Sequence, residues 1–180
     1  MSKMVNMEFD GNAVSVPEGM TLVDAAATVG VHIPNLCHIK ELRGVGACRM
    51  CMVEIQKRGR TKLVASCLYA VEEGLSVQTE TEKVKSIRRM IIELLWPSTQ
   101  RYAKEYGVTH SRFTTGLTDC SLCGLCVRYC AEVKKSSALY LKGRGIDRKP
   151  ALVAGSPLEC STCGECFSLC GSGWVVASRG

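Results

Sequence analysis

The sequence predicts an α+β chain with an N-terminal α+β domain, a helical linker and a small C-terminal module built on a repeat. Three observations lead to this prediction. Residues 1–80 alternate apolar and polar residues between turn signals, and a capped amphipathic helix follows them. Residues 119–180 carry one cysteine pattern twice, forty positions apart (120 to 160). We therefore divide the chain into 1–80, 81–118 and 119–180.

The N-terminal domain is expected to begin with a hairpin and a short helix. Asp10-Gly11-Asn12 and residues 59–61 are typical of turns. Thr21, with Asp24 three positions later, predicts a helix start, and Gly30 predicts its end. The predicted strands are Met4–Phe9, Ala13–Val16, 51–55 and 75–79.

A second helix is expected in the linker. Thr79 and Glu82 form a predicted capping box, and Pro97 marks the end. The expected apolar face is Val84, Ile87, Met90, Ile91, Leu94 and Leu95. The cations Lys83, Lys85, Arg88 and Arg89 are expected off that face. The face predicts packing within the molecule, with a partner-binding groove as the alternative. The polar stretch 98–119 predicts one further helical turn.

Twelve cysteines in 180 residues make cysteine chemistry the main feature of the sequence. No apolar signal segment opens the chain, and no apolar run approaches the roughly 20 residues of a membrane span. We therefore expect a cytoplasmic protein without a membrane span. Thiols stay reduced in that compartment, so clustered cysteines bind metal more often than they form disulfides.

The formal net charge of +6 counts every cysteine as a neutral thiol. Metal-bound cysteines are thiolates, so bound anionic clusters would offset this charge. The basic stretches at 85–89 and 142–149 are short and lack interleaved aromatic residues. We therefore expect no nucleic-acid partner.

The first cysteine set is Cys37, Cys48, Cys51 and Cys67, with spacing C-x10-C-x2-C-x15-C. A [2Fe–2S] cluster needs four thiolates, two for each iron. Here a loop supplies three of them, and one more distant residue supplies the fourth. Gly44 and Gly46 lie in the long gap, where glycine lets backbone N–H groups approach the sulfurs. The alternatives are buried unpaired cysteines or a zinc site, although a zinc ribbon normally has two C-x2-C knuckles and only one is present.

The second and third sets each follow C-x2-C-x2-C-x3-C, the bacterial [4Fe–4S] pattern, in which the fourth cysteine crosses to the other cluster. Gly124 and Gly164 occupy equivalent places, where a side chain would crowd the cluster. The proline that commonly follows the fourth cysteine is replaced by Ala131 and Gly171. The predicted sets are Cys120, Cys123, Cys126 and Cys170 for one [4Fe–4S] cluster, and Cys160, Cys163, Cys166 and Cys130 for the other. Zinc is again the alternative.

Two segments carry a family resemblance: VSVPEGMTLVDAAATVGVHIPNLCH at 14–38 and GACRMCMVEI at 46–55. They resemble the N-terminal ferredoxin-like region of the large iron–sulfur subunit of NADH dehydrogenases and of NAD(P)-linked, including bifurcating, hydrogenases. The resemblance implies a β-grasp fold with the four cysteines as ligands. CVRYCAEV at 126–133, followed by KGRG, resembles a later region of the same subunits. Plant-type ferredoxins and the iron–sulfur subunit of succinate dehydrogenase have the spacing C-x4-C-x2-C, which differs from the C-x10-C-x2-C spacing of this chain.

One feature of that family is missing. Its members often carry a histidine-ligated cluster between the two modules, yet residues 81–119 contain no cysteine. We expect His110 to be a bystander or a hydrogen-bond donor near Cys120. His38 is expected to tune the cluster beside Cys37, and no role is assigned to His32. The twelve cysteines are all used by one [2Fe–2S] and two [4Fe–4S] clusters, so none remains as a nucleophile.

The predicted function is electron relay without a catalytic site in this chain, because no glycine-rich phosphate loop follows a strand and ten residues after Cys170 leave no room for a catalytic domain. The resemblance implies a soluble NAD(P)H-linked oxidoreductase of the hydrogenase or formate dehydrogenase type, with electron bifurcation as an option. The implied partners are a flavin- and NAD(P)-binding subunit, a thioredoxin-like [2Fe–2S] subunit, a hydrogenase or formate dehydrogenase subunit, and ferredoxin. The alternatives are a freestanding polyferredoxin carrier and a zinc-binding interaction module.

Overall fold

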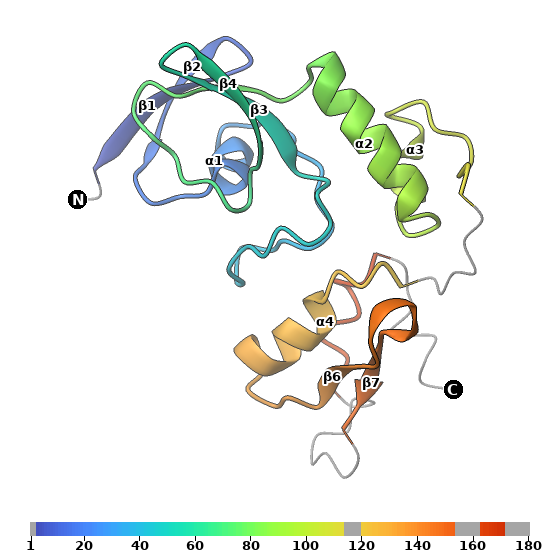
Figure 1. Ribbon diagram of the computed structural model, residues 1–180. Coiled ribbons are helices and arrows are strands. Elements are labelled where there is room, and N and C mark those ends of the chain that lie inside the picture. The colour runs from blue at the N-terminus through green and yellow to red at the C-terminus, as the bar shows by residue number, and fades with distance from the viewer. Residues whose placement is uncertain (1–2, 114–119, 154–162, 172–180) are drawn as a thin grey trace.

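The computed structural model describes residues 3–113, 120–153 and 163–171 (Figure 1). Its N-terminal part is a five-stranded sheet of order β2-β1-β5-β3-β4. β1 and β5 are parallel, and the other neighbours are antiparallel. The strands are β1 Met4–Phe9, β2 Asn12–Pro17, β3 Met52–Lys57, β4 Arg60–Ala65 and β5 Ser76–Gln78. The α+β character expected for the N-terminal part is confirmed.

Two-residue turns with positive φ at both positions close the two hairpins. Asp10 (φ 49°) and Gly11 (φ 83°) join β1 to β2, and Arg58 (φ 49°) and Gly59 (φ 72°) join β3 to β4. This conformation matches the twist of the flanking strands. The first turn lies where the sequence places it, whereas the second begins one residue before the predicted 59–61. The strand β4 was not predicted, because as an edge strand it leaves its first residues exposed and shows no clear alternation.

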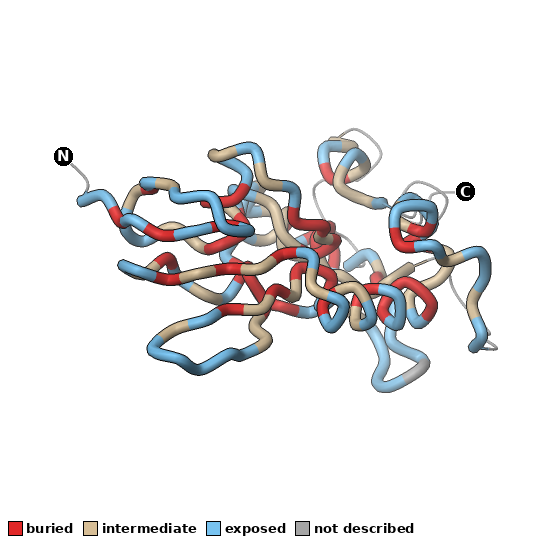
Figure 2. The backbone as a smooth tube through the Cα atoms, turned by 90° about the horizontal axis from the view of Figure 1, so that it is seen from above, coloured by how far each residue is buried: buried red, intermediate tan, exposed pale blue. Residues whose placement is uncertain are grey.

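The N-terminal core lies between the sheet and helix α1 (Leu22–Thr28). Buried and exposed residues alternate along β1, as Figure 2 shows for the sheet. The Thr21 side chain accepts a hydrogen bond from the Asp24 backbone N–H, so the predicted cap is present. The helix ends at Val29, and Gly30 follows with a φ of 78°. The buried apolar side chains of the core include Val5, Met7, Phe9, Leu22, Val53, Ile55, Leu75 and Val77.

Helix α2 (Glu82–Leu94) begins two residues later than a cap at Thr79 would place it. Thr81 is the cap, and its side chain accepts from the Val84 N–H at 3.2 Å. Thr79 instead donates through its backbone N and its hydroxyl to the Asp10 carboxylate, at 2.7 and 2.6 Å. The prediction of Thr79 as cap is wrong because its backbone N–H and hydroxyl are bound to Asp10 in the β1–β2 turn.

The buried face of α2 also differs from the predicted one. Met90 and Leu94 are 42% and 48% exposed, while Ile92 is fully buried. Arg88, expected on the polar side, is fully buried. Arg88 lies one turn from both Val84 and Ile92, so the packed stripe includes a cation. The apolar pattern alone therefore predicted the buried face only in part.

The C-terminal module follows the short helix α3 (Gln100–Ala103), the one helical turn expected in the linker. Helix α4 (Leu125–Arg128) continues into the π-helical turn η1 (Tyr129–Val133). A two-stranded antiparallel sheet then joins β6 (Leu139–Lys142) to β7 (Lys149–Leu152) through a 3₁₀ turn, η2 (Gly145–Asp147).

The loop between α1 and β3 extends from the sheet toward α4 (Figure 1). Arg128 donates from Nη2 to the Arg43 carbonyl at 2.6 Å, and the Tyr102 hydroxyl donates to the Asn35 carbonyl at 2.8 Å. The loop thus contacts both the linker and the C-terminal module. Among the described residues, no helix has the length and apolar character needed to cross a bilayer.

Candidate iron–sulfur cluster sites

The first four cysteines lie together inside the N-terminal domain. Their exposed fractions are between 1% and 7%. Cys51 directly precedes β3 and Cys67 follows β4, and these strands pair with Met52 opposite Ala65. The pairing brings the Cys51 and Cys67 sulfurs to 3.4 Å. Two thiolates on one tetrahedral metal with bonds of about 2.3 Å would be about 3.8 Å apart, so this pair needs little movement to bind one iron.

Cys37 and Cys48 form the second pair, at opposite ends of the loop. The Cys48 backbone N–H donates to the Cys37 sulfur at 3.4 Å. Among the described residues, no three Cys, His, Asp or Glu side chains converge on one point as ligands of a single ion. The sulfurs are instead arranged two and two, the division that a two-iron cluster requires.

Each pair contains one easily ionised thiol. Hydrogen bonding from Cys37 lowers the pKa of Cys48 to about 6, and hydrogen bonding from Cys67 lowers the pKa of Cys51 to about 6. The same hydrogen bonds raise the pKa of each partner, Cys37 and Cys67. The thiolate is the form that binds metal, so the lowered pKa of one thiol in each pair favours ligand formation.

Glycines let the loop approach Cys67 closely. A Cβ on Gly44 would lie 2.0 Å from the Cys67 carbonyl oxygen, and one on Gly46 would lie 2.6 Å from Leu68 Cδ1. The Gly46 backbone also hydrogen-bonds to the Cys67 sulfur, which opposes the rise in its pKa. The expected approach of a backbone N–H group to sulfur is thus present at Gly46. At Gly44, glycine is required because a side chain would clash with the Cys67 backbone.

The histidine after the first cysteine is held by a carboxylate. His38 Nε2 lies 2.8 Å from Asp24 Oδ1, and the Thr21 hydroxyl donates to Asp24 Oδ2 at 2.5 Å. Burial raises the pKa of Asp24, but the hydrogen bonds from His38 and Thr21 outweigh burial and lower it. Asp24 therefore orients the His38 ring, and the two pairs of sulfur atoms do not include this side chain. His110 is exposed, and its Nδ1 lies 2.9 Å from the Thr109 hydroxyl.

The C-terminal cysteines lie around two cavities. One is lined by Cys120, Cys123, Cys126 and Cys170, the four residues predicted to share a cluster. Burial raises the pKa of the Cys126 thiol to about 12 and also raises the pKa values of Cys120 and Cys123. Apolar surroundings disfavour a free thiolate, and a bound cation would favour the ionised form of these residues.

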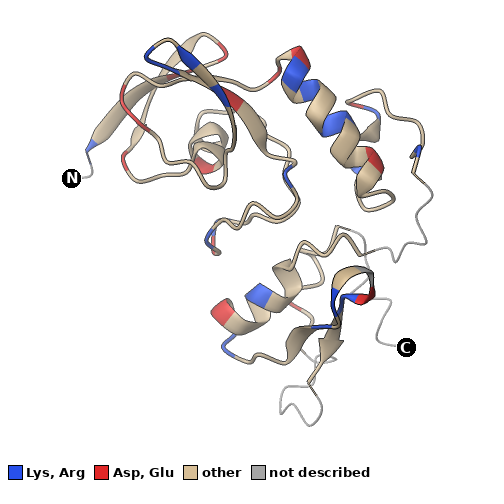
Figure 3. Ribbon diagram, in the orientation of Figure 1, with Lys and Arg blue, Asp and Glu red and all other residues tan. Residues whose placement is uncertain are grey.

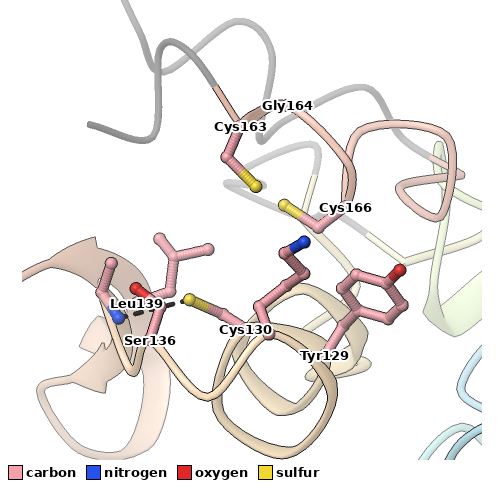
Figure 4. A pocket seen from close by; sticks show the side chains of 9 residues that line it. Tyr129, Cys130, Ser136, Leu139, Cys163, Gly164 and Cys166 are labelled. Carbon is pink, nitrogen blue, oxygen red and sulfur yellow. Dashed lines mark hydrogen bonds between the residues drawn. The ribbon is translucent and has the colours of Figure 1, made fainter. Parts of the chain in front are cut away.

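The second cavity is lined by Cys130, Cys163 and Cys166 (Figure 4). Cys130 comes from η1 and faces the other two sulfurs across the cavity. The Ala138 backbone N–H donates to the Cys130 sulfur at 3.2 Å. The fourth residue predicted for this set, Cys160, lies outside the described residues. In both cavities the fourth cysteine of one repeat faces cysteines of the other repeat, the arrangement expected from crossed ligation.

Two glycines mark equivalent places in the repeats. Gly124 and Gly164 have φ values of 74° and 57°, in the region that favours glycine. A Cβ on Gly124 would meet no protein atom within 4 Å, whereas one on Gly164 would lie 3.2 Å from Phe167. Backbone conformation is therefore a requirement that the two positions share, and crowding of a bound cluster stays a prediction.

Buried polar atoms without partners test whether these sites suit a bound group. In the described part of the chain, five buried side-chain atoms have no hydrogen-bond partner: His38 Nδ1, Ser66 Oγ, Arg88 Nε, Arg128 Nη1 and Ser136 Oγ. His38 and Ser66 adjoin Cys37 and Cys67 in sequence. Arg128 lies between Cys126 and Cys130, Ser136 lines the second cavity, and Arg88 binds the carbonyl of the residue after Cys51. Because such atoms are costly to leave unpaired, their gathering beside the cysteines fits groups rich in acceptor atoms, as iron–sulfur clusters are.

The first two cysteine sites are neighbours. Leu36 directly precedes Cys37, and it also lines the cavity of Cys120, Cys123, Cys126 and Cys170. Cys123 packs against the apolar cluster that contains Leu36, Cys37 and Cys48. Cys126 and Cys166, one from each C-terminal cavity, share a further apolar cluster. The three cysteine sets therefore form a row, with the set of Cys120 in the middle.

Comparison with known proteins decides the character of the N-terminal domain. Residues 2–82 match the family model of the 2Fe-2S iron–sulfur cluster binding domain. We call these residues the 2Fe-2S domain, after the family model that they match. The 2Fe-2S domain contains Cys37, Cys48, Cys51 and Cys67, the two sulfur pairs described above. Holding this cluster is what the paired, buried and partly ionised thiols are suited to do.

The relatives of the whole chain extend beyond the 2Fe-2S domain. NADPH-Fe(3+) oxidoreductase subunit alpha of Geobacter sulfurreducens is 30% identical over 97% of this chain, which covers 24% of that protein. NADP-reducing hydrogenase subunit HndD of Solidesulfovibrio fructosivorans is 28% identical over 96% of this chain and 36% of its own length. NADH-ubiquinone oxidoreductase 75 kDa subunit of Reclinomonas americana is 30% identical over 97% of this chain and 29% of its own length. The chain thus spans about a quarter to a third of these relatives.

A solved structure is similar over most of both chains. It is described as an NAD+-reducing [NiFe]-hydrogenase in the H2-reduced state. The similarity has a TM-score of 0.76 with 26% sequence identity, covering 87% of this chain and 81% of that one. The resemblance expected from the sequence, to iron–sulfur subunits of NADH dehydrogenases and NAD(P)-linked hydrogenases, is therefore confirmed.

Proposed function

We propose that this chain is an electron-relay subunit of a soluble, multi-subunit NAD(P)H-linked oxidoreductase of the hydrogenase or formate dehydrogenase type. The observation that carries the proposal is the row of three cysteine sites, linked by Leu36 and by the packing of Cys123 against Cys37 and Cys48. Bound clusters, one [2Fe–2S] and two [4Fe–4S], would supply one-electron carriers that protein side chains cannot provide.

The chain's own residues hold, order and shield these carriers. In the proposed assignment, Cys37 and Cys48 hold one iron of the first cluster, and Cys51 and Cys67 hold the other. Cys120, Cys123, Cys126 and Cys170 hold the middle cluster, and Cys130, Cys160, Cys163 and Cys166 hold the last. The proposed N-terminal fold is the β-grasp. Leu36 and neighbouring apolar side chains exclude water between the first two sites, which lowers the local dielectric constant.

The proposed partners follow from the relatives. The names of those relatives describe NADPH-, NADP- or NAD-linked reactions, so one partner would be a flavin- and NAD(P)-binding subunit. A thioredoxin-like [2Fe–2S] subunit, a hydrogenase or formate dehydrogenase subunit and ferredoxin are the other proposed contacts, and bifurcation remains an option within this proposal. We place the protein in the cytoplasm. Lys and Arg residues lie along α2 and in the β3–β4 hairpin (Figure 3), and those that are exposed suit an acidic partner. A freestanding carrier is expected to be acidic instead.

The test is reduction of the purified holoprotein under anaerobic conditions. Dithionite should bleach the cluster absorbance, and NADH or NADPH alone should not. Adding a catalytic amount of a flavin-containing NADH diaphorase should then allow NADH to reduce the chain. NAD(P)H oxidation by the chain without any flavoprotein would overturn the relay proposal, because it would require a nucleotide site within this chain.

A further inference from the structure

Ser66 has a buried hydroxyl group in the 2Fe-2S domain, next to the ligand candidate Cys67. The residue is fully buried, between the end of β4 and Cys67. Its backbone N–H donates to the Cys51 carbonyl at 3.1 Å, which fixes the backbone beside both cysteines. Its Oγ has no hydrogen-bond partner. An unpaired buried hydroxyl is costly to stability, so its presence here indicates that an acceptor is needed.

The surroundings of Ser66 contain sulfur as the acceptor. Cys51 and Cys67, whose sulfurs are 3.4 Å apart, flank this segment. The site is closed to solvent, so bulk water cannot replace the acceptor.

The same feature recurs in the C-terminal module. Ser136 lines the cavity of Cys130, Cys163 and Cys166, and its backbone N–H donates to the Cys130 carbonyl at 3.0 Å. Its Oγ is buried and also has no partner. Two serines thus have the same relation to a cysteine carbonyl and an unpaired hydroxyl at two different cysteine sites. This recurrence favours a role toward the bound group over a local packing accident.

We propose that Ser66 is a positioning residue whose hydroxyl donates a hydrogen bond to a sulfur atom of the bound [2Fe–2S] cluster and thereby raises its reduction potential. The proposal rests on the proposed function only in requiring that the site holds this cluster. Reduction adds negative charge to the cluster, and an O–H dipole directed at sulfur stabilises that charge. Loss of the hydroxyl therefore makes reduction less favourable.

The test is a potentiometric titration of the Ser66→Ala holoprotein, followed by electron paramagnetic resonance. The signal of a reduced [2Fe–2S] cluster persists at temperatures at which [4Fe–4S] signals are broadened, so the clusters can be read separately. We expect the equilibrium constant for reduction of the [2Fe–2S] cluster to fall about tenfold, a shift of about 59 mV to lower potential for one electron. The [4Fe–4S] potentials should not move.

Ser136→Ala is the matched control, because it removes the other unpaired hydroxyl. It should leave the [2Fe–2S] potential unchanged. The pair Ser66→Thr and Ser66→Val separates the hydroxyl from shape, since Thr and Val are nearly isosteric. The Thr variant should have the higher [2Fe–2S] potential. If only the hydroxyl-bearing variants, wild type and Thr, assemble the cluster, the hydroxyl is needed at the site, which supports the proposal.

Two results would contradict parts of this account, and they are distinguishable. Ser66→Ala with a full [2Fe–2S] signal and an unchanged potential would mean that Ser66 only fills space. A wild-type protein that shows no [2Fe–2S] signal when reduced would instead overturn the cluster assignment, and the role of Ser66 would fall with it.

Discussion

Gly44 is the residue at which the cysteine loop has the least freedom. A Cβ there would lie 2.0 Å from the Cys67 carbonyl oxygen and 3.2 Å from the Cys67 Cβ. Its φ lies outside the left-handed region, so close contact rather than backbone conformation requires glycine. The contact places the loop against the segment that carries the fourth ligand. The position of the loop is therefore coupled to the position of the Cys67 ligand candidate at Gly44.

Replacing Gly44 with alanine should separate the loop from Cys67. The clash is with backbone atoms that cannot rotate away, so we expect a loss of about 3 kcal/mol, the upper part of the range for overpacking. We also expect a loss of the [2Fe–2S] signal, measured by circular dichroism and by electron paramagnetic resonance after anaerobic reduction. Val45→Ala, at the exposed neighbouring position, is the control and should retain both. A Gly44→Ala protein with wild-type melting and a full signal would show that the loop is not held this tightly.

Helix α2 is attached to the 2Fe-2S domain by a buried cation. Arg88 donates from Nη1 to Glu80 at 2.5 Å and to the Tyr106 hydroxyl at 2.7 Å, and from Nη2 to the Met52 carbonyl at 2.9 Å. These partners come from three segments: the start of β3, the segment that leads into α2, and the linker. Burial raises the pKa of Tyr106 beyond its ordinary value, so this hydroxyl remains protonated and uncharged beside the cation.

Arg88→Met should loosen this attachment. Removing one partner of a buried ion pair costs about 3 kcal/mol at the low end, which is appropriate because Glu80 is partly exposed. For a chain of this length the midpoint of thermal unfolding should fall by about 6–12 °C. Lys83→Met is the control, since it makes the same change in charge at an exposed position of the same helix. Equal, small effects of the two substitutions would contradict the structural role of Arg88.

The elements differ in how far the sequence predicted them. The hairpin at Asp10-Gly11 and the helix start at Thr21 follow from local rules, because their partners lie within a few residues. The start of α2 does not, since Thr79 is held by Asp10, which is distant in sequence. The burial of Arg88 depends on partners from three segments, so the apolar pattern of the helix could not indicate it. The apolar pattern of a helix predicts which apolar side chains are buried. Partners from other segments decide which polar side chains are buried beside them.

The candidate sites show the same division. The grouping of cysteines into two cavities follows the spacing of the repeats, and so does the crossing of Cys130 and Cys170. The pairing of sulfurs, the role of Gly44 and the unpaired hydroxyls of Ser66 and Ser136 required the structure. Serine is common beside cysteine in this sequence, so the only signal for Ser66 was its position next to Cys67.

At the scale of the whole molecule, the three cysteine sites form a row whose middle member is the set of Cys120, Cys123, Cys126 and Cys170. Leu36 and Cys123 join it to the first site, and the shared packing of Cys126 and Cys166 joins it to the last. In the proposed relay, electrons would pass between the first and last sites through the middle one. Partners at the two ends of the row would exchange electrons only if the middle site is loaded.

Spin relaxation should report this order. A reduced [2Fe–2S] cluster relaxes faster when a paramagnetic neighbour is close. Cys123→Ala, which removes a ligand of the middle site, should slow that relaxation, whereas Cys163→Ala, at the far site, should leave it near the wild-type rate. The measurement is progressive power saturation of the reduced [2Fe–2S] signal, with iron content determined for each variant. Equal effects, or a larger effect of Cys163→Ala, would contradict the order.

The central claim, three iron–sulfur clusters in one chain, is tested most directly by the metal and sulfide content of the anaerobically purified protein. The account predicts about ten irons and ten acid-labile sulfides per chain, from one two-iron and two four-iron clusters, without stoichiometric zinc. About two irons would leave only the first site and contradict the assignment of the C-terminal module. Stoichiometric zinc without sulfide would contradict electron relay altogether.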